Sequence, residues 1–173
     1  MTTIAYRDGI LAVDRLMAHG SFIRPTDMKM RIIKTRQGLD YALVFTGSIV
    51  MGVAFEQWIE EGRVRGEYPM KDIDQQKAFH ALLVERHVND LDHPTVQYFG
   101  NDLIGMSEDE MQYVAQGTGD EFAYGAFFMN ATAVEAVQAA NAQCAWSGFG
   151  VLYVDVKGDF EIKRWKEKES YHR

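Results

Sequence analysis

The order of strand-like and helix-like segments is the feature that most limits the folds open to this chain. Strand signals come first, then one helix, then strands, then two helices and then strands again. The predicted strands cover 2–7, 10–13, 29–33, 41–45, 79–87, 95–99, 148–156 and 160–165, and the predicted helices cover 48–61, 121–129 and 131–142. Asp8-Gly9 predicts the turn of the first hairpin, the strands 79–87 and 95–99 form the third predicted hairpin, and Thr132 is the predicted cap of the last helix. Because every helix must bury its apolar face against a sheet, this order predicts an α+β fold, with two antiparallel sheets face to face and helices outside.

Two stretches carry weaker signals. The segment 15–27 contains Gly20 and Pro25, which favours a loop with a little strand. The stretch 63–76 is polar and too poor in apolar residues to bury a helix face. We therefore expect irregular structure at both places.

Composition and charge narrow the class of protein. The 173 residues predict a single domain over 1–173, and their net charge of −7 argues against nucleic acid or an anionic membrane as a partner, since both bind basic surfaces. The single Cys144 cannot form an internal disulfide and no signal peptide opens the chain, so a cytoplasmic location is expected. The longest apolar run, 49–55, is too short to cross a bilayer.

Thr2 directly follows the initiator Met1, which makes it a candidate nucleophile. Methionine aminopeptidase accepts a small second residue, so we expect Met1 to be removed and Thr2 to carry both a hydroxyl and a free α-amine. The α-amine has an ordinary pKa near ~8, and a modest fall in that pKa makes it a base for the hydroxyl. Threonine after methionine is also common, and in most proteins it has no catalytic meaning.

Five short motifs occur in the order found in proteasome β subunits and in the bacterial HslV peptidase. They are Thr2-Thr3-Ile4-Ala5 with the stretch 8–15, Lys29-Met30-Arg31, Phe45-Thr46-Gly47-Ser48, Gly117-Thr118-Gly119 and Cys144-Ala145-Trp146-Ser147-Gly148. The chain therefore resembles this family of threonine proteases, which belong to the N-terminal nucleophile hydrolases. The resemblance implies their four-layer αββα sandwich and hydrolysis of peptide bonds.

The resemblance implies a role for each residue that matches a motif. Thr2 Oγ1 would attack the peptide carbonyl. Lys29, paired with Asp14, would lower the pKa of the Thr2 amine and hydroxyl through its positive charge. The backbone N–H of Gly47 would donate to the developing oxyanion, a contact worth roughly 3–4 kcal/mol in well-studied hydrolases. Thr118 would orient the Thr2 amine.

The resemblance also implies a supporting site and a specificity pocket. Ser147 would support the nucleophile's surroundings. In the HslV-like form of the site, a monovalent cation such as Na⁺ would lie among backbone carbonyls around Asn141, Cys144 and Ser147, and no other cofactor is required. The first specificity pocket would be lined by three apolar residues, Phe45, Ile49 and Val53. Such a pocket takes uncharged hydrophobic side chains, because an unpaired charge costs several kcal/mol to desolvate.

The partners implied are a polypeptide substrate, further copies of the chain in a ring, and an ATP-dependent unfoldase. Two features depart from the family. Asp14 comes earlier after Thr2 than it does there, and only one mid-chain helix, 48–61, is predicted where the family has two. Because mid-chain helices contribute to contacts between stacked rings in the family, a reduced oligomer is a further expectation.

The residues alone leave two points open at the site. Asp14 and Lys29 also fit an ordinary surface ion pair, worth ~0–1 kcal/mol. Counting from Thr2 without gaps puts Lys34 in the place of Lys29. We prefer Lys29, because it opens a predicted strand and is followed by Met-Arg, whereas Lys34 falls in a turn.

Metal binding and the function of the whole chain have competing interpretations too. The histidines around the third hairpin, His80, His87 and His93, fit no zinc spacing and are better explained by a solvated polar loop. For the whole chain, two functions compete with a peptidase: a catalytically silent proteasome-like subunit, and an N-terminal nucleophile amidase that acts on a small amide.

Overall fold

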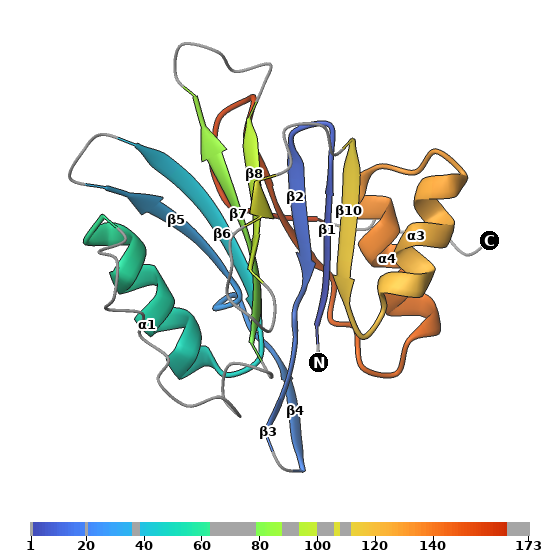
Figure 1. Cartoon of the computed structure of the whole chain (residues 1–173). Helices are drawn as coiled ribbons and strands as arrows, with labels where there is room; N and C mark the ends of the chain where they lie inside the picture. The colour runs from blue at the N-terminus through green and yellow to red at the C-terminus, as the bar shows by residue number, and fades with distance from the viewer. Residues whose placement is uncertain are drawn as a thin grey trace.

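The computed structural model describes residues 2–19, 21–35, 39–62, 79–87, 94–99, 106–107 and 112–165. These residues form four layers, with one helix on one side, two sheets in the middle and two helices on the other side (Figure 1). The predicted αββα sandwich is therefore confirmed. The predictions for Met1, for 63–76 and for His93 lie outside the described residues.

The first sheet carries the N-terminus of the chain and has the strand order β10-β1-β2-β11-β12. Its antiparallel strands are β1 (Thr3–Arg7), β2 (Ile10–Asp14), β10 (Tyr113–Gly117), β11 (Val151–Asp155) and β12 (Lys163–Arg164). β1 and β2 form the hairpin predicted around Asp8 and Gly9, which both have positive φ. β1 thus lies between β10 and β2 in the sheet, and Thr2 directly precedes it.

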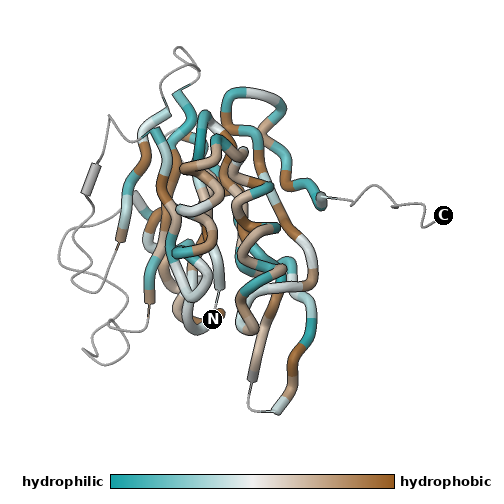
Figure 2. The backbone as a smooth tube through the Cα atoms, turned by 90° about the vertical axis from the view of Figure 1, so that its right-hand side faces the viewer, coloured by the Kyte–Doolittle hydropathy of each residue, from teal (hydrophilic) through white to brown (hydrophobic). Residues whose placement is uncertain are grey.

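The second sheet has the order β5-β6-β7-β8-β9. Its antiparallel strands are β5 (Met30–Lys34), β6 (Asp40–Thr46), β7 (His80–Arg86), β8 (Thr95–Phe99) and β9 (Met106–Ser107). A separate two-stranded hairpin, β3 (Leu16–His19) and β4 (Phe22–Pro25), connects the two sheets in sequence. It projects beyond both sheets in two views at right angles (Figures 1 and 2).

Helices cover the outer face of each sheet. α1 (Ile49–Glu60) packs on the second sheet, and α3 (Asp120–Phe128) and α4 (Ala133–Gln143) pack on the first (Figure 1). The predicted cap of α4 is confirmed, because Thr132 Oγ1 accepts from the Glu135 N–H while the Glu135 carboxylate accepts from the Thr132 N–H. Within the described residues, no helix has the length and apolar character needed to span a membrane.

Alternation along the strands builds three apolar cores between the four layers. In β1, Ile4 and Tyr6 face the second sheet while Ala5 faces α3 and α4. In β6, Val44 faces the first sheet and Phe45 faces α1. This period of two is what a sheet buried on both faces requires. The sandwich therefore holds its central strands between packed layers, which fixes the positions of the strand ends.

Two differences between the structure and the prediction lie next to Thr2. The segment 15–27, expected to be mostly loop, forms the β3–β4 hairpin. Pro25 is tolerated because it lies at the end of a strand in a two-stranded ribbon, where a missing N–H costs no ladder bond. The strand β10 was not predicted, since its apolar residues Val114 and Ala115 form too short a run. The β3–β4 hairpin and β10 both flank Thr2, so both help to form the site.

Candidate active site

Thr2 immediately precedes β1 and is buried, with 2% of its surface exposed. Its backbone nitrogen donates to Thr118 Oγ1 at 3.3 Å, and its carbonyl accepts from the Thr118 N–H at 2.9 Å. Thr118 follows β10, so these contacts extend the β1–β10 ladder. The hydroxyl predicted to orient the nucleophile thus lies against the nitrogen that becomes an α-amine when Met1 is removed.

Gly117 makes this approach of Thr2 to Thr118 sterically feasible. Its φ of +105° lies in the region that favours glycine, and an added Cβ would lie 1.8 Å from the Thr2 carbonyl oxygen. Any side chain at this position would therefore push Thr2 out of place. The first glycine of the Gly117-Thr118-Gly119 motif is therefore required by the backbone geometry, and Thr118 supplies the hydroxyl.

Asp14 and Lys29 form a buried ion pair. Lys29 Nζ donates to Asp14 Oδ1 at 3.0 Å, and the two side chains are 7% exposed for Lys29 and 0% exposed for Asp14. The Asp14 carboxylate also accepts backbone N–H groups from Thr3 at 2.8 Å, Leu16 at 2.9 Å and Gly148 at 3.3 Å. The interpretation as a surface ion pair is therefore wrong, and removing either partner would leave an uncompensated buried charge.

Burial perturbs the ionisation of both partners. It lowers the pKa of Lys29, and the Asp14 carboxylate opposes that fall. It raises the pKa of Asp14, opposed by Lys29 and by the backbone donors. Shifted pKa values of buried groups beside a cavity are typical of functional sites, where a lysine that gives up its proton more readily can take part in proton transfer.

Lys29, Thr2 and Gly47 line one small cavity of about 60 Å³. Gly47 is exposed at the turn between β6 and α1, and its φ of +100° favours glycine there. The remaining lining residues are Leu16, Met17, Ala18, Thr26, Phe45 and Ile49. The fold therefore brings the predicted nucleophile, the predicted positioning lysine and the predicted oxyanion donor to one space.

Two of the three residues predicted for the specificity pocket, Phe45 and Ile49, line this cavity. The Phe45 ring also packs into the core under α1, where a Cβ on Gly52 would lie 2.1 Å from it. Val53 is 37% exposed and is not among the described residues that line the cavity. The apolar wall beside Thr2 is thus provided by Phe45 and Ile49.

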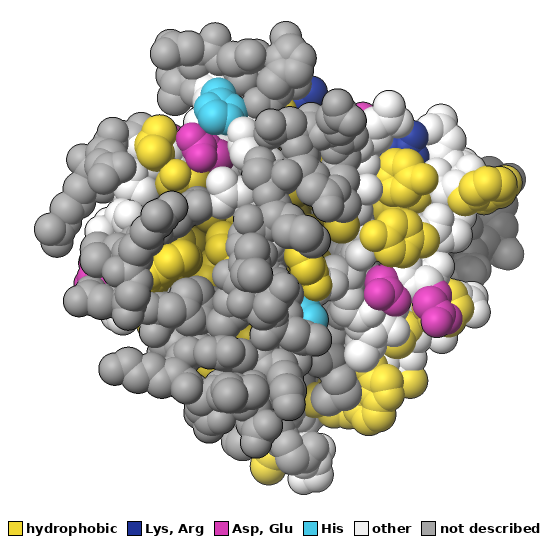
Figure 3. Space-filling view, in the orientation of Figure 1, with side chains coloured by type: hydrophobic (Ala, Val, Ile, Leu, Met, Phe, Trp, Pro, Cys, Tyr) yellow, Lys and Arg dark blue, Asp and Glu magenta, His cyan; other side chains and the backbone are white. Residues whose placement is uncertain are grey.

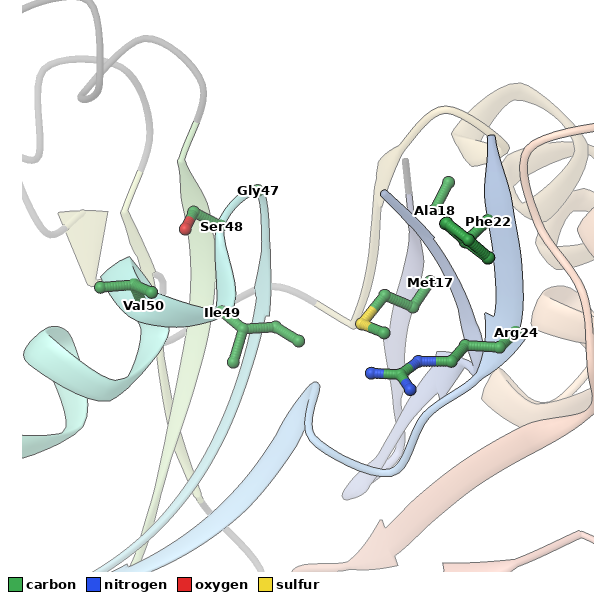
Figure 4. Close-up of a pocket in the computed structure, with 8 residues that line it drawn as sticks. All are labelled: Met17, Ala18, Phe22, Arg24, Gly47, Ser48, Ile49 and Val50. Atoms are coloured by element: carbon green, nitrogen blue, oxygen red, sulfur yellow. The ribbon is translucent and has the colours of Figure 1, made fainter. Parts of the chain in front are cut away.

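An open groove of about 730 Å³ continues from the small cavity (Figure 4). One wall comes from the β3–β4 hairpin, and the other from the β6–α1 turn. Its lining residues are Met17, Ala18, Phe22, Arg24, Gly47, Ser48, Ile49 and Val50. Sequence reasoning missed the hairpin wall, because the run Phe22-Ile23-Arg24-Pro25 shows no alternation of polar and apolar residues.

A third cavity, of about 420 Å³, also borders Thr2 and is lined mostly by residues that carry polar groups. It is lined by Thr2, Thr46, His80, Tyr98, Gln116, Gly117, Thr118 and Asp120. The two sheets contribute jointly, because Thr46, His80 and Tyr98 come from the second sheet and Gln116 from the first. Thr2 therefore separates two spaces of different chemistry.

A hydrogen-bonded chain crosses between the sheets in this polar cavity. The Tyr98 hydroxyl lies 3.1 Å from His80 Nδ1 and accepts from Gln116 Nε2 at 2.9 Å. His80 opens β7 and is partly buried, which lowers its pKa, so it does not lie in the solvated loop expected from the sequence. No local sequence motif predicts these hydrogen bonds, because His80, Tyr98 and Gln116 lie far apart in the sequence.

The residues predicted around the cation lie close to the same site. Ser147 is buried and its Oγ donates to Asn141 Oδ1 at 2.6 Å. The Cys144 Sγ donates to the Thr118 carbonyl at 3.4 Å. In the described part of the chain, no three His, Cys, Asp or Glu side chains are grouped to hold a metal ion. A monovalent cation held by backbone carbonyls stays a prediction.

Lys34 lies at the other end of β5 from Lys29. It is exposed and pairs in register with Asp40 at the far end of the β5–β6 hairpin. At ~3.3 Å per residue along a strand, five residues place it roughly 17 Å from Lys29. The geometry therefore favours Lys29 over Lys34 as the lysine beside Thr2.

Comparison with known proteins finds similarity in structure alone. No family model and no curated protein sequence matches the chain. A solved structure of Anbu, an ancestral beta-subunit, from Yersinia bercovieri has a TM-score of 0.70 at 10% identity, over 99% of this chain and 89% of that one. A helical assembly of the Anbu complex from Pseudomonas aeruginosa gives 0.69 at 9% identity, over 99% and 89% of the two chains.

A second kind of neighbour was solved with a bound inhibitor. The protein BPH from Thiobacillus denitrificans in complex with epoxomicin has a TM-score of 0.56 at 15% identity, over 96% of this chain and 99% of that one. At such identities, likeness establishes the fold only. The chain shares its α+β sandwich with these Anbu and BPH structures.

Proposed function

We propose that this protein is a threonine-type peptidase that uses Thr2 as its nucleophile after Met1 has been removed. The observation that carries the proposal is the cavity that Thr2 shares with Lys29 and Gly47, with the Lys29 ammonium buried against Asp14. The fold shared with a protein solved with epoxomicin, an inhibitor of threonine proteases, supports the same chemistry. We expect the enzyme to act in the cytoplasm, as its single cysteine suggests.

In the proposed reaction the Thr2 α-amine takes the proton of Oγ1 as the oxygen attacks the substrate carbonyl. The Gly47 N–H stabilises the negative oxygen that forms. The C–N bond then breaks, the leaving amine takes the proton, and an ester on Thr2 remains. Water, deprotonated by the same α-amine, hydrolyses the ester and restores the enzyme.

Lys29 and Thr118 position and activate Thr2 in this scheme. A positive charge on Lys29 lowers the pKa of the Thr2 amine and hydroxyl, because it stabilises their deprotonated forms relative to the protonated ones. Asp14 holds Lys29 in place, and its own backbone contacts fix its orientation. Thr118 Oγ1 fixes the nitrogen of Thr2. Every group in the scheme belongs to the chain, so no cofactor is required.

We also propose that the chain acts as a subunit of a self-compartmentalised assembly. Apolar side chains gather over α3 and β10 on the right of Figure 3. At the end of α3, Phe128 and Met129 are 88% and 78% exposed. Exposed apolar patches of this kind mark interaction sites. The Anbu complex from Pseudomonas aeruginosa forms a helical assembly, which supports contacts between copies of this chain. An ATP-dependent unfoldase remains an expected partner.

The open groove favours a peptide substrate over a small amide. A small-amide amidase needs only a compact polar site, whereas the groove of about 730 Å³ beside Gly47 accommodates several residues of an extended chain. A catalytically silent subunit would differ from the proposed enzyme only in whether Thr2 turns over substrate.

Hydrolysis of a fluorogenic peptide with leucine before the dye tests the proposal. We expect the wild-type protein to release the dye and Thr2→Ala to release none, with both proteins unfolding at the same temperature. Thr35→Ala, at the exposed far end of β5, is the matched threonine control and should hydrolyse at the wild-type rate. Undiminished hydrolysis by Thr2→Ala would refute the proposal, and no hydrolysis by the folded wild type would favour the silent subunit.

A further inference from the structure

The open groove beside Gly47 has apolar walls and one charged side chain. Among the described residues that line it, Arg24 carries the only charge, and Met17, Phe22, Ile49 and Val50 provide most of the apolar surface. In Figure 4 the Arg24 side chain extends from β4 across the groove toward Ile49 on the opposite wall. A guanidinium placed in this way faces whatever occupies the groove.

Arg24 is available to a ligand. Two arginines elsewhere in the described chain show the contrast, because Arg15 and Arg164 both form ion pairs with Asp27. Within the described part of the chain, no carboxylate pairs with Arg24. An arginine of this kind in an apolar groove attracts an anionic group, which it can bind through two parallel hydrogen bonds.

Arg24 holds a defined place relative to the nucleophile. The groove shares Met17, Ala18, Gly47 and Ile49 with the cavity that contains Thr2, so the two spaces are continuous. In an extended peptide, successive side chains point to opposite sides, and side chains two residues apart point to the same side. When the residue before the scissile bond faces the small cavity, the residue two positions earlier therefore faces the same wall, where the groove lies.

From this arrangement we infer that Arg24 selects substrates with an acidic side chain two positions before the residue whose carbonyl is attacked. The inference rests on the proposed function and adds a specificity to it. We expect the residue that enters the small cavity to be uncharged and apolar, because Phe45 and Ile49 line that space and its one cation, Lys29, already pairs with Asp14. The preferred substrate segment thus carries a carboxylate and an apolar side chain on one face, separated by one residue.

Peptides that differ at one position test this inference. Three fluorogenic tetrapeptides with leucine before the dye carry glutamate, glutamine or lysine two positions earlier. We expect wild-type kcat/KM to be at least about tenfold higher for glutamate than for lysine, with glutamine between them, a ratio that corresponds to about 1.4 kcal/mol. Arg24→Gln should remove this order, and Arg24→Glu should reverse it. Lys34→Glu makes the same charge change at the exposed far end of β5 and should keep the wild-type order.

A binding measurement separates this inference from the proposed function. The same peptides, labelled and added to the Thr2→Ala protein, should bind in the order glutamate, glutamine, lysine by fluorescence anisotropy, and Arg24→Glu in that background should reverse the order. This result is expected even if the wild type hydrolyses nothing. Equal binding of the three peptides, or an equal shift caused by Lys34→Glu, would overturn the role of Arg24. Arg24→Gln serves as the test variant if Arg24→Glu fails to fold.

Discussion

The two sides of Thr2 offer a substrate very different surroundings. On one side, the groove is walled by apolar side chains with Arg24 as the one charge among its described lining residues, and the small cavity combines apolar residues with the Lys29 ammonium and threonine hydroxyls. On the other side, the residues that line the cavity around His80 carry hydroxyl, amide, imidazole and carboxylate groups. A single buried threonine lies between them.

The difference follows from which strands, turns and helices meet at this end of the sandwich. The apolar side is formed where β6 turns into α1 and where the β3–β4 hairpin leaves the first sheet, so side chains from the adjoining cores continue into it. The polar side is formed where the ends of β7, β8 and β10 meet, and there polar residues satisfy one another across the gap. Under the proposed function, the apolar side takes the acyl part of the peptide and the polar side takes the leaving amine.

The largest effect should come from the lysine on the apolar side. Lys29→Met is expected to lower kcat/KM at least ~10²-fold, the usual scale for a positioned acid–base group. Lys34→Met removes the same charge from the exposed end of the same strand and should leave the rate unchanged. Because Lys29→Met leaves Asp14 buried without its cation, thermal unfolding must be recorded beside the kinetics. A slow but folded Lys34→Met with a fast Lys29→Met would show that the assignment of the two lysines is reversed.

On the polar side, Gly117→Ala should disturb Thr2 through its backbone. The new Cβ meets the Thr2 carbonyl oxygen at 1.8 Å and the residue keeps a positive φ, so we expect a loss of ~2 kcal/mol or more in the free energy of unfolding. Gly125→Ala, within α3 where the space is open, should be neutral or stabilising by up to ~1 kcal/mol. Urea unfolding of both variants measures the contrast. Equal stability of the two would mean that Thr2 and Gly117 are not in the contact described.

The apolar side should discriminate by charge at the residue before the scissile bond. Peptides with leucine or phenylalanine there should be hydrolysed faster than peptides with arginine or glutamate, because the described lining of the cavity beside Phe45 holds no carboxylate for an arginine and its one cation, Lys29, already pairs with Asp14. Phe45→Ala should change the rates for leucine and phenylalanine, since its ring lines the cavity. Faster hydrolysis after arginine or glutamate, with Phe45→Ala silent, would show that this cavity does not hold that residue.

The smallest expected effect is on the pH dependence of the free energy of unfolding, through His80 on the polar side. Burial lowers the pKa of His80 in the folded protein below its ordinary value of 6.5. Between those two values the unfolded chain binds more protons than the folded one, so the free energy of unfolding decreases as the pH falls below about 6.5. His80→Phe should make this decrease shallower. An identical decrease in wild type and variant, measured by urea unfolding from pH 7.5 to 5, would remove His80 from this role.

The sequence predicted most of the sandwich because strand alternation and helix periodicity are local signals. Asp8 and Gly9 marked the first hairpin, Thr132 marked the start of α4, and Lys29 was preferred over Lys34 because of its place at the start of a strand. The polar cavity could not be predicted in this way. His80, Tyr98 and Gln116 lie on three strands in two sheets, and only the packing of the sheets brings their side chains together. The β3–β4 hairpin was missed for a local reason, since its strands are four residues long and Gly20 and Pro25 favour a loop.

Intact mass spectrometry tests most directly whether Met1 is removed and Thr2 is the nucleophile that reacts between these two sides. A peptide epoxyketone reacts stably only with a residue that offers both a hydroxyl and a free α-amine, as an N-terminal threonine does. We predict that the untreated protein has the mass of the chain without Met1, that treatment adds the mass of one inhibitor, and that peptide mapping places it on Thr2, while Thr2→Ala takes up none. Retention of Met1 in the wild type, or labelling that persists in Thr2→Ala, would contradict the account.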